Sequence, residues 1–243
     1  MSSYQQQKIF QGYYGKLPAR GDFVGKGLPR SFIDPWDTWS RTAMYAGKQQ
    51  LGNTWLNSYL TSPPYWYVLS PHNCGEQIWM GVVIPSVDSV GRYFPLTLCR
   101  TASISANPLL LFKQHSQWFS DAERLLISCL QDGFQLENFE QDLQHLSLDE
   151  SGTVMQASLQ HYEHSAWRVA ANSLDHRMNA YPILLEDVLK SFCMAYSVWK
   201  TEGSQHIPAS LLVSQGLPPF AGIASMLDGD WQNAGWLSVR ETL

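Results

Sequence analysis

The 243-residue sequence is poor in charged residues, which make up only 15% of it. Because soluble domains average about a quarter, this chain must depend on apolar burial for its stability. Its net charge of −5 excludes a general attraction to nucleic-acid phosphates or to anionic lipid surfaces. It contains no apolar run of about 18 residues that could form a transmembrane helix, and residues 1–8 are polar rather than signal-like. These absences predict a cytoplasmic protein that binds no nucleic acid and inserts directly into no membrane.

The sequence also lacks the motifs that mark common catalytic sites. Gly27, and not Ser or Thr, follows Gly25-Lys26, so no phosphate-binding P-loop is present. Neither the dinucleotide-binding GxGxxG pattern nor the GxSxG elbow of serine hydrolases occurs. The four cysteines are widely spaced, form no CxxC pair and are expected to be reduced, mostly buried thiols; they are Cys74, Cys99, Cys129 and Cys193. We therefore expect no enzyme activity, no cofactor and no metal site.

Aromatic residues, in contrast, are abundant, with 10 Trp, 11 Tyr and 10 Phe. Rings bury a large area per residue, so a substantial core is expected. Periodicity and turn residues predict strands at 9–15, 65–70, 77–84, 93–100, 166–170, 196–200 and 210–214, and a loop at 16–29. They predict helices at 31–46, 55–60, 109–130, 137–146, 184–195 and 220–227. This alternation favours an α/β fold, namely a three-layer α/β/α sandwich with a mixed central sheet.

No linker rich in Pro, Gly or Ser divides the chain, so a single domain spanning residues 1–243 is expected. The polar stretch Ser147–Gly152 separates two differently patterned parts of it. Residues 1–147 are rich in motifs, and residues 148–243 are less distinctive.

Two segments, 12–24 and 85–96, combine glycines, prolines, charges of both signs and apolar residues. Glycine permits unusual backbone angles, and Arg and Asp can fix such loops by charge-assisted hydrogen bonds. One interpretation is therefore structural: the Arg and Asp residues pin the loops to each other or to nearby backbone. The other is a partner-binding surface made of rigid loops and exposed aromatic residues. The candidate residues are Lys16, Arg20, Asp22, Ser86, Asp88 and Arg92.

Trp36 and Trp39 complete the candidate partner-binding set. They lie in the predicted helix at 31–46, on a face that repeats every three or four residues. Such spacing is also typical of a helix face packed into a core. Both interpretations stay open for the two Trp residues.

The same blocks make the sequence recognisable. It resembles the TagF family, accessory proteins of the bacterial type VI secretion system. The resemblance rests on GYYGKLPARGDFV (12–24), GLPRSF with PWDTW (27–39), PPYWYVLSP (63–71) and GVVIPSVDSVGRYFPLTL (81–98), and more weakly on GLPPF (216–220) and LDGDW (227–231). It spans nearly the whole chain. Basic residues that are common in the family after the PPYW and SVD motifs are replaced here by Tyr67 and Ser89.

The resemblance implies a three-layer α/β protein of the cytoplasm without known enzymatic activity. It further implies a post-translational repressor of type VI secretion that binds the forkhead-associated scaffold protein of that system. Two alternatives remain. The chain could be a structural adaptor that promotes assembly of the secretion machine. It could instead be an enzyme acting on a phosphorylated ligand held by Lys16, Arg20 and Arg92, although no nucleophile or base accompanies them.

Overall fold

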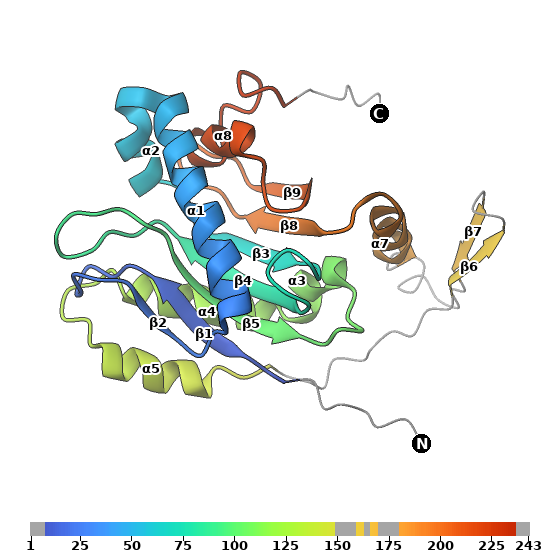
Figure 1. Ribbon diagram of the computed structural model, residues 1–243, viewed down its shortest axis with the longest axis horizontal. Coiled ribbons are helices and arrows are strands. Elements are labelled where there is room, and N and C mark those ends of the chain that lie inside the picture. The colour runs from blue at the N-terminus through green and yellow to red at the C-terminus, as the bar shows by residue number, and fades with distance from the viewer. Residues whose placement is uncertain (1–7, 149–158, 163–165, 170–179, 237–243) are drawn as a thin grey trace.

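The computed structural model describes residues 8–148, 159–162, 166–169 and 180–236, and a seven-stranded sheet forms its centre (Figure 1). The strands are β1 (Gln11–Gly15), β2 (Val24–Lys26), β3 (Tyr65–Leu69), β4 (Ile78–Ile84), β5 (Leu96–Ala102), β8 (Tyr196–Thr201) and β9 (Ser210–Gln215). Their order across the sheet is β2-β1-β5-β4-β3-β8-β9. β6 (Leu159–Tyr162) and β7 (Ala166–Val169) form a separate two-stranded hairpin.

Every strand pair of the sheet is antiparallel, so the expectation of a mixed sheet is wrong. The reason lies in the connections. β3, β4 and β5 are joined by loops at 70–77 and 85–95, whereas parallel neighbours need a long crossover, usually a helix. The central strands are nevertheless buried on both faces, a pattern that is more common in parallel sheets. This double burial makes strand direction hard to predict from hydrophobicity.

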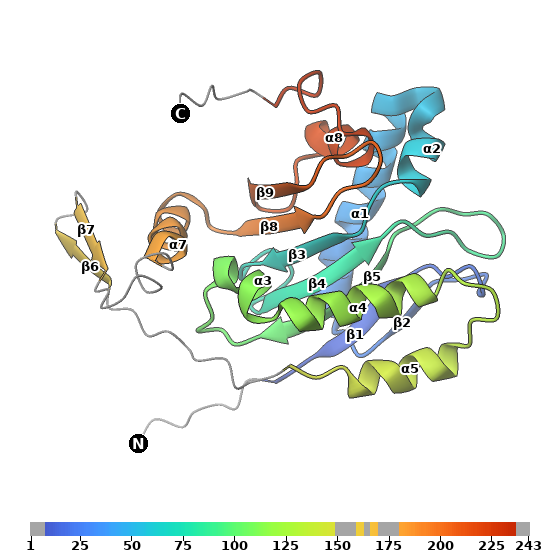
Figure 2. The same ribbon diagram turned by 180° about the vertical axis from the view of Figure 1, so that it is seen from behind.

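Helices lie on both faces of the sheet (Figures 1 and 2). α1 (Arg30–Leu51), α2 (Trp55–Leu60) and α8 (Ile223–Asp228) lie over one face. α3 (Leu111–Gln114) and α4 (Ser116–Ser128) lie over the other, and α5 (Leu136–His145) is next to β1 and β2. α7 (Ala180–Phe192) lies beside the end of β8. Short 3₁₀ turns occur at Gly52–Thr54, Pro108–Leu110 and Phe220–Gly222. None of the helices in the described parts of the chain has the length and apolarity needed to cross a membrane.

The two faces of the sheet carry two separate hydrophobic cores, which strand alternation explains. On β4, Ile78 and Met80 point into the core beneath α4, and Trp79 between them points into the core beneath α1. The aromatic residues are concentrated under α1, where Trp36 stacks on Tyr67 with ring centroids 4.8 Å apart. Many of the aromatic residues counted in the sequence lie in these two cores.

The C-terminal part of the chain completes the same sheet. β8 pairs with β3, and β9 pairs with β8, so residues from beyond 195 extend a sheet that begins at Gln11. The predicted boundary at 147–152 falls mostly outside the described residues, which omit 149–158. α8 ends as predicted, because Gly229 adopts the left-handed conformation with a φ of 80°.

Candidate functional site

Two loops that are far apart in sequence meet at one end of the sheet. Residues 16–23 connect β1 to β2, and residues 85–95 connect β4 to β5; we call them the loop pair. Arg20 of the first loop accepts a hydrogen bond at its carbonyl oxygen from the Ser89 amide of the second (3.0 Å). The two segments singled out in the sequence therefore form one structure.

A buried ion pair holds the loop pair together. The Lys16 ammonium nitrogen lies 2.6 Å from the Asp88 carboxylate, and both side chains are almost completely buried. A buried charge without a partner is costly, so removing Asp88 would leave the Lys16 ammonium buried without its carboxylate. Lys16 and Asp88 thus act first as a structural lock between the loops.

Asp88 also organises its own loop. Its Oδ1 accepts hydrogen bonds from the amides of Val90 (3.1 Å) and Arg92 (2.8 Å), and its Oδ2 accepts one from the Arg92 guanidinium (2.7 Å). Burial alone would raise the pKa of Asp88, but the hydrogen bonds from Lys16 and from the Arg92 backbone and side chain outweigh it. They hold this pKa well below its usual range, so the carboxylate stays ionised.

Ser86 is the second fixed point of the loop pair. Its hydroxyl donates to the Lys16 carbonyl oxygen (2.8 Å), which joins the two loops again. Its backbone is held by Tyr59 of α2: the Tyr59 hydroxyl donates to the Ser86 carbonyl oxygen (2.9 Å) and accepts from the Ser86 amide (2.8 Å). Ser86 is buried, so it positions the loop and does not reach a partner directly.

The remaining candidate charges face outward. Arg92 donates to the Gly21 carbonyl oxygen, and its guanidinium lies 3.5 Å from Asp22, whose side chain is 99% exposed. Arg20 extends toward Glu137 of α5 at 3.8 Å. Arg20 and Arg92 each keep about half of their side chains exposed. The surface of the loop pair therefore presents Arg20, Asp22 and Arg92 on a rigid base.

The candidate residues chosen from the sequence did not include the aromatic residues of this surface. Phe23 is 37% exposed and stacks on Tyr14, with ring centroids 5.5 Å apart. The Arg41 guanidinium lies 5.1 Å from the Phe23 ring, and it also binds Asp37 of α1. Although partial burial would raise the pKa of Asp37, hydrogen bonds from Arg41 and Tyr14 hold it below its ordinary value. The spacing of Asp37 and Arg41, four residues apart on a helix, was the available signal.

Comparisons with known proteins identify the family. The model of the TagF N-terminal domain, described as type VI secretion system-associated, matches residues 12–146, which include the whole loop pair. The chain belongs to the TagF family. A solved structure, that of PA0076 from Pseudomonas aeruginosa PAO1 at 2.05 Å resolution, is 35% identical. The match covers 92% of this chain and 95% of that chain, with a TM-score of 0.77. No curated protein matches the chain.

Two residues of the TagF-like motifs that the sequence analysis considered for contact with a partner are buried. Trp36 is fully buried between Phe32, Tyr67 and Trp199, so it is a core residue and cannot touch a partner. Tyr67, where the sequence analysis expected a departure from the TagF pattern, is also fully buried, and its hydroxyl is 2.7 Å from that of Thr97. Residue 67 therefore offers no surface to a partner.

Trp39 and Ser89 lie nearer the surface than these two core residues. Trp39 is half-buried and donates its indole N–H to the Pro218 carbonyl oxygen (3.0 Å). Ser89 is exposed in the loop pair. Of the two positions where a family basic residue is replaced, only Ser89 can affect a contact with a partner.

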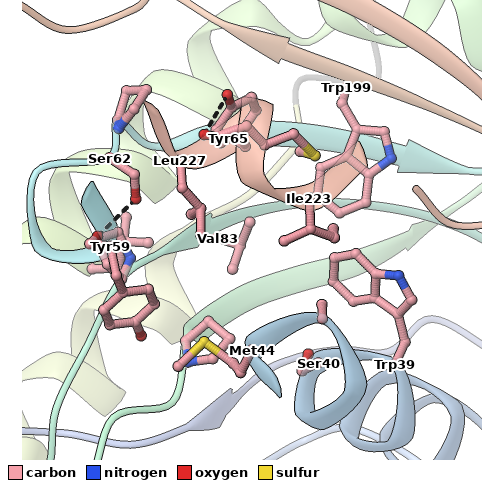
Figure 3. A pocket seen from close by; sticks show the side chains of 16 residues that line it. Trp39, Ser40, Met44, Tyr59, Ser62, Tyr65, Val83, Trp199, Ile223 and Leu227 are labelled. Atoms are coloured by element: carbon pink, nitrogen blue, oxygen red, sulfur yellow. Dashed lines mark hydrogen bonds between the residues drawn. The ribbon is translucent and has the colours of Figure 1, made fainter. Parts of the chain in front are cut away.

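An apolar cavity of about 90 Å³ lies between the sheet and helices α1, α2 and α8 (Figure 3). Two of its polar neighbours are engaged elsewhere: the Ser62 hydroxyl donates to the Tyr59 carbonyl oxygen, and the Tyr65 hydroxyl donates to that of Met226. The buried hydroxyl of Ser40, which also lines the cavity, has no hydrogen-bond partner among the described residues. Small-molecule sites usually measure about 300–1,000 Å³, so this cavity is small for a substrate. Among the described residues, its lining contains no acidic, basic or thiol side chain.

The site as a whole is a fixed, charged and aromatic platform. Across residues 8–148, 159–162, 166–169 and 180–236, no group of three or more His, Cys, Asp or Glu residues could hold a metal ion. The loop pair's own carboxylate, Asp88, is held by internal partners. This geometry suits recognition of a protein surface, in which rigid loops present a few exposed anchors.

Proposed function

We propose that this TagF-family protein is a cytoplasmic, post-translational repressor of type VI secretion. It acts by binding the forkhead-associated scaffold protein of that system and makes or breaks no covalent bond. The proposal is carried by one observation: the family match over residues 12–146 contains the whole loop pair. The family match itself assigns only an association with type VI secretion.

The geometry of the loop pair supports binding as the mode of action. Lys16, Ser86 and Asp88 are buried and fully engaged, so they keep the loops rigid before any partner arrives. Preorganised loops lose little conformational entropy on association. Arg20 and Asp22 are exposed on this base and are the proposed anchors, with Phe23 and Arg41 beside them.

Repression needs only a preference for one state of the scaffold protein. A ligand that binds the inactive state about 10⁴-fold more tightly than the active one moves the balance from 1:99 to 99:1. An interface with a few well-placed anchors reaches that difference. No catalytic residue is required.

The direct test is a binding assay with the purified, unphosphorylated forkhead-associated protein. The wild-type chain should bind, and Arg20→Ala with Asp22→Ala should weaken binding at least about tenfold, because both side chains are proposed anchors. The matched control is Asp121→Ala with Arg124→Ala, which removes an exposed pair of the same charges from α4 on the far face of the sheet. Equal losses in both double variants would contradict an interface at the loop pair.

The sign of the regulation requires a secretion assay. Deleting the gene should raise type VI secretion, and overexpression should lower it. An adaptor that promotes assembly would give the opposite pair of results while using the same interface. Secretion that is unchanged in both strains would overturn the proposal.

A further inference from the structure

β9 forms one edge of the sheet and is unusually open to another strand. It pairs with β8 on one side, and no other strand of the described chain pairs with it on the other. An edge strand exposes backbone N–H and C=O groups that can form a ladder with another chain. β9 is six residues long, so this free edge offers several such groups.

Protein edges are usually blunted by charge, proline, short length or a covering element. β2, at the opposite edge, shows these devices: it has only three residues, carries Lys26, and is tied by that side chain to Glu140 of α5. β9, with the sequence Ser-Leu-Leu-Val-Ser-Gln, contains no charged residue and no proline. Among the residues that the structure describes, these devices are present at the β2 edge and absent from the β9 edge.

The exposed side chains of β9 are Leu211, Val213 and Gln215, which share one face, and the first two are apolar. Leu211 is 66% exposed and Val213 is 38% exposed. They pair with Lys200 and Val198 of β8, on the side away from the buried Leu212. Lys200 is already engaged, because its ammonium lies 2.6 Å from Glu202 and 4.6 Å from the Trp66 ring centroid. An occupant of this edge therefore meets apolar side chains and free backbone, with no unpaired charge on β9 itself.

The β9 sequence is nearly symmetric about Leu212. In an antiparallel pairing of two β9 strands centred there, Ser210 faces Ser214 and Leu211 faces Val213, and each contact occurs twice. Apolar side chains meet apolar ones, and small polar side chains meet each other. Such self-complementarity is what a two-fold interface between identical chains requires. Two chains of net charge −5 also repel each other least where the contact strand carries no charge.

We infer that the free edge of β9 binds a second copy of this chain. The two β9 strands pair antiparallel about a two-fold axis at Leu212 and join the two sheets into one continuous sheet. A stable dimer buries about 800 Å² on each partner, and a six-residue strand provides a small contact by that standard. The expected dimer is therefore weak, with a Kd in the micromolar range.

The test is the solution mass of the full chain over a series of concentrations, measured by sedimentation. The wild type should move from 27.5 kDa toward twice that mass as the concentration rises through the micromolar range. Leu211→Lys with Val213→Lys should abolish the dimer, because the symmetric contact would then hold four ammonium groups. Tyr45→Lys with Ile9→Lys is the control: the two residues are 67% and 62% exposed and lie outside both β9 and the loop pair, so dimerisation should persist.

The register is tested separately by cysteine cross-linking. In a Cys193→Ser background, Leu211→Cys with Val213→Cys should give a covalent dimer on mild oxidation, since the two positions lie opposite each other. Leu211→Cys with Gln215→Cys keeps both thiols on the same face but out of register, and should cross-link far less. Stronger cross-linking of this second variant would overturn the Leu212-centred pairing.

Other outcomes also decide the matter. A wild type that stays monomeric at several hundred micromolar would overturn the inference, as would a dimer that survives Leu211→Lys with Val213→Lys. A monomeric chain whose lysine variant loses the scaffold protein in the binding assay would assign the edge to that partner instead. None of these results depends on whether the loop pair is an interface.

Discussion

The loop pair and the β9 edge are both exposed, but they differ in charge and in how fully their polar groups are hydrogen-bonded. In the loop pair, the central carboxylate of Asp88 has four hydrogen-bond donors, and the exposed charges lie on a base that cannot easily move. At β9, the exposed side chains are uncharged, and the backbone has a partner strand on one side only within the described chain. A charged, internally satisfied surface favours selective and reversible contacts, whereas a neutral strand edge favours backbone pairing. The molecule therefore carries two different kinds of binding surface.

The loop pair and the β9 edge are both held by the same rigid core. The largest predicted effect, on the free energy of unfolding, tests that core. Trp36→Ala should lower the free energy of unfolding by about 3–5 kcal/mol, because a fully buried Trp leaves a large cavity. Denaturant titration followed by circular dichroism measures the loss. Trp36→Phe should cost less, since it keeps an aromatic ring and removes an indole N–H that has no partner among the described residues.

Trp39→Ala is the matched comparison for that core variant. Because Trp39 is half-buried, Trp39→Ala should lower the free energy of unfolding by less than Trp36→Ala does. If the two alanine variants were equally stable, Trp36 would not be the core residue described here.

The next effect is specific to the loop pair. Lys16→Met should lower the free energy of unfolding by about 3 kcal/mol, because it removes one partner from a buried ion pair. Lys26→Met removes a lysine from a largely exposed pair with Glu140 and should cost less than about 1 kcal/mol. Chemical denaturation of both variants at neutral pH makes the comparison. Similar small losses would show that the Lys16–Asp88 pair does not lock the loops.

Much of the loop pair could be anticipated from the sequence, and the reason is chemical. Asp88 and Arg92 are four residues apart in a glycine-containing loop, and such charges need partners, so their pairing was expected. The side-chain partner of Arg20 was not anticipated: it contacts Glu137 of α5, a residue more than a hundred positions away. The residue pattern within one segment does not predict which distant element of the chain will pack beside that segment.

The fold shows the same division between local and distant information. Most strands and helices of the N-terminal part follow from periodicity, with two exceptions. The three residues of β2 lie inside a predicted loop. The single helix predicted at 109–130 is instead a 3₁₀ turn followed by α3 and α4, which are separated at His115. The antiparallel direction of the sheet was not predicted. Strands such as β4 are buried on both faces, so their side chains carry no alternation that reports on direction. The role of Tyr59 in holding Ser86 depends on the packing of α2 and could not be seen in the sequence.

A smaller predicted effect is a loss of stability at acid pH, which arises from Asp88 in the loop pair. The pKa of Asp88 is held below its usual range in the folded chain, while an unfolded Asp titrates near about 3.9. Between these two values the unfolded chain binds more protons, so stability falls as the pH falls. The contribution is complete above about pH 4–5 and is lost progressively below it.

Thermal melts from pH 7 down to pH 2 test this dependence. Asp88→Asn should flatten the acid side of the stability profile, and Asp22→Asn, which changes an exposed carboxylate in the same loop pair, should leave it as in the wild type. An acid profile that is the same for the wild type and Asp88→Asn would show that another group controls the acid loss.

The smallest predicted effect on stability is at β9, and it sharpens the contrast between the two regions. Leu211→Lys should change the free energy of unfolding of the monomer by no more than about 0.5 kcal/mol, because the side chain is largely exposed and makes no buried contact to lose. Its neighbour Leu212 points into the core beneath α1, so Leu212→Ala should cost about 2–5 kcal/mol. Denaturation at low micromolar concentration, where the chain is expected to be mostly monomeric, measures both. A large loss for Leu211→Lys under these conditions would mean that this face of β9 is covered within the chain itself, and the edge would then be unavailable to a second copy.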